Sequence, residues 1–135
     1  MSEQESTESV DAENIYLKIA LSPEQADSYF VTMFKRIAES AHNCSKKNGF
    51  WEGEQNDGEK IALMHSELSE ALEALRKKNP PDDKIKNFSA VEAELADVII
   101  RIMDYGVARN MKIAQAVIEK NKYNMERPFK HGKEF

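Results

Sequence analysis

Residues 59–109, EKIALMHSELSEALEALRKKNPPDDKIKNFSAVEAELADVIIRIMDYGVAR, decide the fold class of this chain. Apolar side chains recur every three or four residues on both sides of the Pro80-Pro81 pair, which is the spacing of one helix face. The two prolines end the first periodic segment, because proline lacks a backbone N–H and clashes with the preceding turn. The first half of the stretch therefore predicts a helix over about 59–78.

The second half of the stretch predicts another long helix. Ser89 followed by Glu92 is the capping-box pattern that begins a helix, and the apolar period then continues to about Arg109. We expect the two helices to bury the following apolar stripes: Ile61, Met64, Leu68, Leu72 and Leu75 in the first, and Val91, Leu95, Val98, Ile99, Ile102 and Tyr105 in the second.

Two more helices flank this pair. The segment Ser22-Pro23-Glu24 combines a capping serine, a first-turn proline and an acidic residue, and the helix it begins ends near Asn48-Gly49. Asn110 is predicted to cap a last helix over about 111–125, which Arg127-Pro128 ends. The fold class is therefore all-α, a four-helix bundle that we expect oligomerisation to complete or extend.

The chain has 135 residues, which suits one domain over 15–135 behind an acidic, flexible tail at 1–14. Residues 15–19 alternate apolar and polar side chains, which fits either a short strand or an extended arm. The formal net charge of −5 argues against broad binding to nucleic acid or to an anionic membrane. A single cysteine, Cys44, and the absence of an apolar run near about 20 residues favour a cytoplasmic protein.

Two acid-x-x-acid pairs are the candidate chemical site, Glu67-x-x-Glu70 and Glu94-x-x-Asp97. Residues three apart share a helix face, so each pair can present two carboxylates to one point. Glu67 and Glu94 border apolar stripes and are expected to be more enclosed than Glu70 and Asp97. Crowded carboxylates raise one another's pKa unless a cation is present, and oxygen ligands favour Mg²⁺, with Mn²⁺ as a substitute.

Other interpretations of these residues stay open at this point. With 24 acidic residues, such pairs also arise by chance, as in Glu70-x-x-Glu73, and serve as a solvated face. Asp97 and Arg101 also fit a plain ion pair one helical turn apart. The Glu39-x-x-His42 motif suggests a di-iron bundle, but that fold needs two such motifs. A non-catalytic helical interaction module is the alternative to an enzyme.

The order of the two motifs, with the helix break between them, resembles the signature of the all-α nucleoside triphosphate pyrophosphohydrolases, the MazG-like superfamily. The resemblance runs from about Phe50 to the C-terminus and is closest to phage and bacterial types. It implies hydrolysis of an NTP or dNTP to the monophosphate and pyrophosphate. It also implies that Mg²⁺ is held by Glu67, Glu70, Glu94 and Asp97, which are then the catalytic residues.

The resemblance extends to the last helix and to the assembly. Lys120 and Asn124 match a lysine and an asparagine that lie near the phosphates in the family, and Arg127 follows them. Members are generally oligomeric, which implies a homodimer or homotetramer with sites near the interface. The chain departs from the family in having Ser66 before Glu67, where a second glutamate is common.

The substrate's base needs a separate contact, for which the aromatic residues of the loop over 49–58 are candidates. Trp51 is predicted to bind substrate by stacking on the base, although it also fits a plug at the end of the bundle. Phe50 is expected to be such a plug. His42 and Asn48 are possible polar contacts from the first helix.

Overall fold

The computed structural model describes residues 21–128, which form four α-helices and no strand. The helices are α2 (Pro23–Lys47), α3 (Asp57–Arg76), α4 (Ala90–Ala108) and α5 (Ile113–Met125). This confirms the predicted all-α class with four helices. The predicted tail at 1–14 and the segment 15–19 lie outside the described residues.

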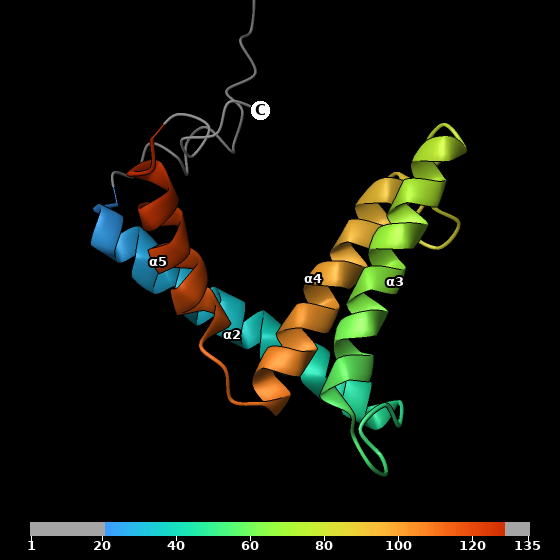
Figure 1. Ribbon diagram of the computed structural model, residues 1–135, viewed down its shortest axis with the longest axis horizontal. Coiled ribbons are helices and arrows are strands. Elements are labelled where there is room, and N and C mark those ends of the chain that lie inside the picture. Colours follow the sequence, from blue (N-terminus) through green and yellow to red (C-terminus); the bar gives the residue numbers. More distant parts are fainter. Residues whose placement is uncertain (1–20, 129–135) are drawn as a thin grey trace, which may run out of the picture.

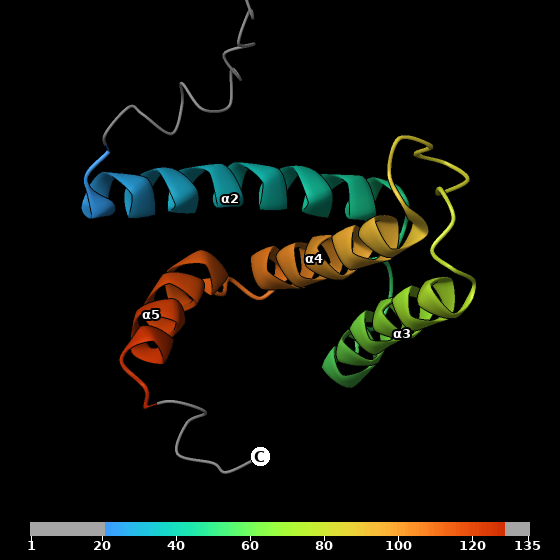
Figure 2. The ribbon, with the colours of Figure 1, turned by 90° about the horizontal axis from the view of Figure 1, so that it is seen from above.

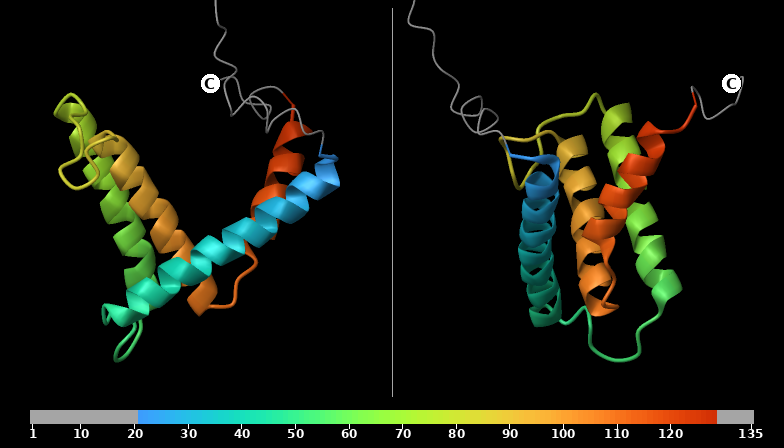
Figure 3. Two further views of the ribbon diagram at one scale, coloured as in Figure 1. Left: turned by 180° about the vertical axis from the view of Figure 1, so that it is seen from behind. Right: turned by 90° about the vertical axis from the view of Figure 1, so that its left-hand side faces the viewer.

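The helices are arranged as an open V (Figure 1). In one arm α3 and α4 lie side by side and run in opposite directions, while α5 packs against the N-terminal half of α2 in the other arm. The view from above in Figure 2 shows α4 between α2 and α3, which agrees with the contacts that α4 makes to both. The two further views in Figure 3 show α2 crossing the base of the V and joining its arms.

Capping residues explain where three of the helices begin. Ser22 and Gln25 form a capping box at α2, Ser89 and Glu92 form another at α4, and Asn56 accepts a hydrogen bond from the backbone of α3. Helix α3 begins about two residues before its predicted start because Asn56 caps it, and it ends about two residues early because the chain turns left-handed at Lys78 and Asn79.

The predicted role of Asn110 as the cap of the last helix is wrong. Asn110 has a φ of 52° and donates its backbone N–H to the carbonyl of Val107 at 3.0 Å, so it ends α4 instead. Asparagine tolerates this left-handed conformation better than most residues, which suits it to a helix end. Helix α5 begins three residues later, at Ile113.

The interior of a single chain is built mainly from small side chains, which corrects the predicted core. Along α3, the residues that pack against α4 are Glu67, Ala71 and Ala74, whereas Leu72 and Leu75 are 50% and 57% exposed. One residue along a helix is a rotation of about 100°, so the leucine stripe points away from the helix pair. Within the described residues, the buried apolar set is Ala38, Ala71, Ala74, Ala93, Met103 and Ala114.

Ser89→Ala is expected to lower the free energy of unfolding by about 1 kcal/mol, because Ser89 Oγ accepts the backbone N–H of Glu92 at the start of α4. Urea denaturation followed by circular dichroism measures this. Ser69→Ala is the matched control, because Ser69 lies exposed in the middle of α3 and bonds to a carbonyl that the helix already satisfies. Equal stability of Ser89→Ala and the wild type would refute the contribution of the cap.

Candidate metal centre

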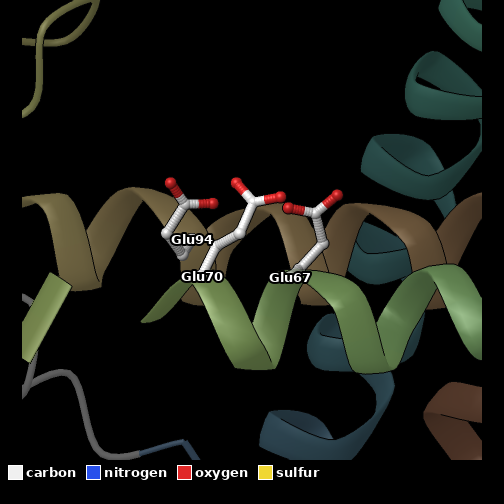
Figure 4. Close-up of side chains that lie close together, drawn as sticks. All are labelled: Glu67, Glu70 and Glu94. Atoms are coloured by element: carbon white, nitrogen blue, oxygen red, sulfur yellow. The ribbon is translucent and has the colours of Figure 1, made fainter. Parts of the chain in front are cut away.

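The antiparallel packing of α3 and α4 brings the two acidic motifs together. Glu67, Glu70 and Glu94 each offer a carboxylate oxygen, and these oxygens all lie within 4.8 Å of one another. Figure 4 shows the three side chains extending to the same side, two from α3 and one from α4. Residues 27 positions apart in the sequence, from Glu67 to Glu94, thus form one cluster that can hold a metal ion.

The four predicted carboxylates differ in burial as their neighbours in the sequence suggested. Glu67 is 7% exposed and Glu94 is half-buried, whereas Glu70 and Asp97 are exposed. Asp97 lies close enough for its charge to act on Glu94, and it lines a cavity together with Glu67. The cluster therefore has an enclosed side at Glu67 and an open side at Glu70, from which a solvated ligand can approach.

The geometry fits a small divalent ion with oxygen ligands. Two oxygens on opposite sides of a magnesium ion are about 4.2 Å apart, since each Mg–O distance is roughly 2.1 Å. Neighbouring oxygens around the same ion are only about 3 Å apart, so three oxygens that lie within 4.8 Å of one another reach a single ion once their side chains draw together. The donor set contains carboxylates alone, which favours Mg²⁺ or Mn²⁺ over zinc.

The pKa of Glu94 reflects the closeness of the other carboxylates. Removal from water raises the pKa of Glu94 above its ordinary value of 4.5, and the negative charges of Glu70, Glu67 and Asp97 raise it further. A carboxyl group whose pKa is raised in this way either holds a proton or shares a bound cation with its neighbours. The cluster is thus arranged to gain from binding positive charge.

Glu94→Gln is expected to stabilise the protein in metal-free buffer at neutral pH. A raised pKa in the folded state means that stability falls as pH rises from the unfolded value through the folded one, and stays lower above it. Glutamine carries no charge, so the variant recovers the stability that the charged Glu94 loses, and its melting temperature should rise by a few degrees. Thermal scans with a chelator from pH 4 to 8 measure it, and the gain should vanish at the acidic end. A lower melting temperature of the variant at neutral pH would contradict the repulsion.

Arg101 provides a positive charge to the enclosed side of the cluster. Its Nε and Nη2 each lie 2.6 Å from Oε1 of Glu67. The sequence suggested a plain ion pair between Arg101 and Asp97, but the arginine pairs across the helix interface instead. The one-turn spacing on α4 therefore predicted the wrong carboxylate as the partner of Arg101.

Asp104 organises a polar network that the sequence did not single out. Its Oδ1 accepts hydrogen bonds from Nδ1 of His42 at 2.7 Å and from Nε1 of Trp51 at 2.8 Å. The His42 and Trp51 rings meet edge to face at 5.4 Å, and Nζ of Lys60 lies 4.2 Å from the centre of the Trp51 ring. One feature of the sequence could have indicated Asp104 as a site residue. The spacing of Asp97, Arg101 and Asp104 places all three on one face of α4.

A cavity of about 470 Å³ lies between this network and the carboxylates. Trp51, Asp104, Arg101, Asp97 and Glu67 all line it, so the predicted substrate-binding tryptophan and two of the predicted ligands share one space. The indole is half-buried at the wall of this cavity. The expectation that Phe50 plugs the bundle is wrong, since its side chain is 62% exposed.

The other predicted substrate-binding residues lie in a different part of the chain. Lys120 and Asn124 are exposed on α5, and Arg127 is exposed just beyond it. Helix α5 occupies the arm of the V that is opposite to α3 and α4 (Figure 1). Lys120 and Arg127 both lie over the ring of Tyr123, at 5.1 and 5.8 Å. A single chain in this arrangement keeps them apart from the carboxylates.

Comparisons with family models, curated proteins and solved structures found no match to this chain. No helix among residues 21–128 is long and apolar enough to span a membrane. The structural findings thus support an all-α chain of four helices with a glutamate cluster suited to a divalent cation.

Proposed function

We propose that this protein is a magnesium-dependent nucleoside triphosphate pyrophosphohydrolase of the MazG-like superfamily. It would convert an NTP or dNTP and water to the monophosphate and pyrophosphate. The observation that carries the proposal is the convergence of both acidic motifs, through Glu67, Glu70 and Glu94, on one point between α3 and α4. The motif resemblance supplies the reaction, and the cluster supplies a place for the cation that the reaction requires.

The carboxylates have unequal roles in this proposal. Glu70, Glu94 and Asp97 would hold Mg²⁺ from the open side, where the phosphates approach. A bound magnesium ion neutralises charge on the phosphates and lowers the pKa of a coordinated water. Glu67, the most enclosed of the four, would orient the attacking water or accept its proton. None of these roles needs a serine or cysteine nucleophile.

The cavity beside the cluster is the proposed site for the nucleoside. Its volume of about 470 Å³ suits a base and a sugar, and it opens toward the carboxylates through Glu67 and Asp97. Trp51 gives the base an aromatic face, and its orientation is fixed by Asp104 and His42.

We also propose that the active form is a homodimer or homotetramer. The stripes left uncovered on α3 and α4 include Leu68, Leu72, Leu75, Leu95 and Ile99, each 43% to 57% exposed. Exposed large apolar side chains in such number mark an interface, since a monomer gains little by leaving them in water. A second copy is also the simplest means of bringing Lys120, Asn124 and Arg127 of one chain to the carboxylates of the other.

A panel of the common NTPs and dNTPs, each with Mg²⁺, tests the activity by following pyrophosphate release. We expect release of pyrophosphate and the matching monophosphate from at least one member of the panel, and none when Mg²⁺ is replaced by a chelator. A protein that is stabilised by Mn²⁺ yet releases no pyrophosphate from any nucleotide would favour the non-catalytic interaction module.

A further inference from the structure

The proposed reaction does not require the contact between Arg101 and Glu67. Two nitrogens of the guanidinium converge on the same oxygen of Glu67, each at 2.6 Å, in a cluster that is otherwise acidic. Glu67 is the most buried of the carboxylates, and an unpaired charge there would be costly. The arginine thus supplies the countercharge that a divalent cation would otherwise supply.

Two cations beside one carboxylate repel each other, so the guanidinium and a divalent ion compete for Glu67. The Arg101 side chain is 37% exposed, so part of it already faces solvent. It also lines the cavity together with Asp97 and Asp104, next to the proposed path of the triphosphate.

We propose that Arg101 is a displaceable counter-ion of Glu67. This inference rests on the proposed function and adds a step to it. In the metal-free protein it neutralises Glu67. When a divalent cation occupies the cluster, the guanidinium leaves Glu67 and binds a phosphate oxygen of the substrate instead. Arginine suits this exchange because its planar fork matches the geometry of both carboxylate and phosphate. The protein is thereby built to bind the cation weakly alone and tightly together with a phosphorylated ligand.

Calorimetric titration of Mn²⁺ into the full chain tests the first half of the proposal. Arg101→Met keeps much of the side chain's length and removes its charge, so Mn²⁺ alone should bind roughly 10-fold more tightly than to the wild type. Arg76→Met is the matched control, because Arg76 lies exposed on α3 and pairs with Glu73 away from the cluster. Unchanged or weaker Mn²⁺ binding by a folded Arg101→Met would show that the arginine merely positions Glu67, and would overturn the proposal.

Titration of inorganic pyrophosphate in saturating Mg²⁺ tests the second half. Arg101→Met should bind pyrophosphate about 10-fold more weakly than the wild type, whereas Arg76→Met should not differ. Equal pyrophosphate affinity in Arg101→Met and the wild type would contradict the transfer to phosphate.

Arg101→Lys decides the matter if Arg101→Met does not fold. Lysine keeps the charge but makes a single-point contact, so Mn²⁺ should still bind more tightly than to the wild type, and no gain would overturn the proposal. A wild-type protein that binds no Mn²⁺ even in the presence of pyrophosphate would refute the proposed function itself. A wild type that binds Mn²⁺ and releases pyrophosphate, with Arg101 variants of unchanged Mn²⁺ affinity, would refute the counter-ion alone.

Discussion

Glu70→Gln and Asp97→Asn are each expected to lower the rate of pyrophosphate release by about 100-fold or more. Each substitution keeps the shape of the side chain and removes the charge that would hold Mg²⁺ on the open side of the cluster. Loss of groups that merely support a metal ligand already costs roughly 10- to 100-fold, so loss of a ligand should cost at least as much. Steady-state rates at saturating Mg²⁺ and nucleotide measure the effect.

The matched control for these variants is Glu73→Gln. Glu73 lies three residues beyond Glu70 on the same helix and pairs with Arg76 and Lys77 instead of joining the cluster. It should retain wild-type rates, and all three variants should keep the helical circular dichroism signal. If Glu70→Gln or Asp97→Asn turned over at the wild-type rate, that residue would not belong to the site.

The double variant Leu72→Glu, Leu75→Glu is expected to dissociate the protein into single chains. Both leucines are half exposed on α3 and lie outside the packed seam with α4. Burying two leucines in an interface contributes roughly 1.5–3 kcal/mol each, so their loss should weaken association by at least about 100-fold. Two carboxylates in place of the leucines would oppose association further. Light scattering coupled to size exclusion measures the mass.

Ile85→Glu is the control for a general effect of added charge. Ile85 is also exposed, but it lies in the loop between α3 and α4 and belongs to neither stripe. It should leave the assembly intact. A wild-type protein with the mass of one chain at micromolar concentration, or a double variant that keeps the wild-type mass, would contradict the proposed oligomer. Loss of activity together with dissociation would support a site that needs two chains.

Local signals in the sequence were sufficient for the helices and for the two acidic motifs. Ser22, Ser89 and the Pro80-Pro81 pair each act within a few residues, so their effect on helix ends follows from the sequence directly. The i,i+3 spacing of the acidic pairs likewise fixed the face on which each pair lies. The neighbours of Glu67 and Glu94 were enough to predict that these two would be more enclosed than Glu70 and Asp97.

What the sequence could not supply was the rotation of each helix against its neighbours. The leucine stripe of α3 is the most apolar face of that helix, yet the adjacent face with Ala71 and Ala74 packs against α4. Small side chains let the two helices approach closely, which brings Glu67 and Arg101 into contact. An apolar stripe that stays exposed on the single chain and a stripe that forms its core have the same period.

The network around Asp104 was missed for a related reason. His42, Trp51 and Asp104 come from three separate segments, and no spacing rule connects them before the chain is folded. The prediction for Asn110 was wrong for a local reason instead, because asparagine is common at both ends of helices. The two errors show where pattern reasoning is weakest, at long-range contacts and at residues with two common roles.

Titration of Mn²⁺ into the metal-free protein tests most directly whether Glu67, Glu70 and Glu94 form a metal site. We expect saturable binding that Glu70→Gln and Glu94→Gln each weaken by about 10-fold or more, while Glu73→Gln binds as the wild type does. Absence of saturable binding in the wild type, or equal affinity in all four proteins, would contradict it.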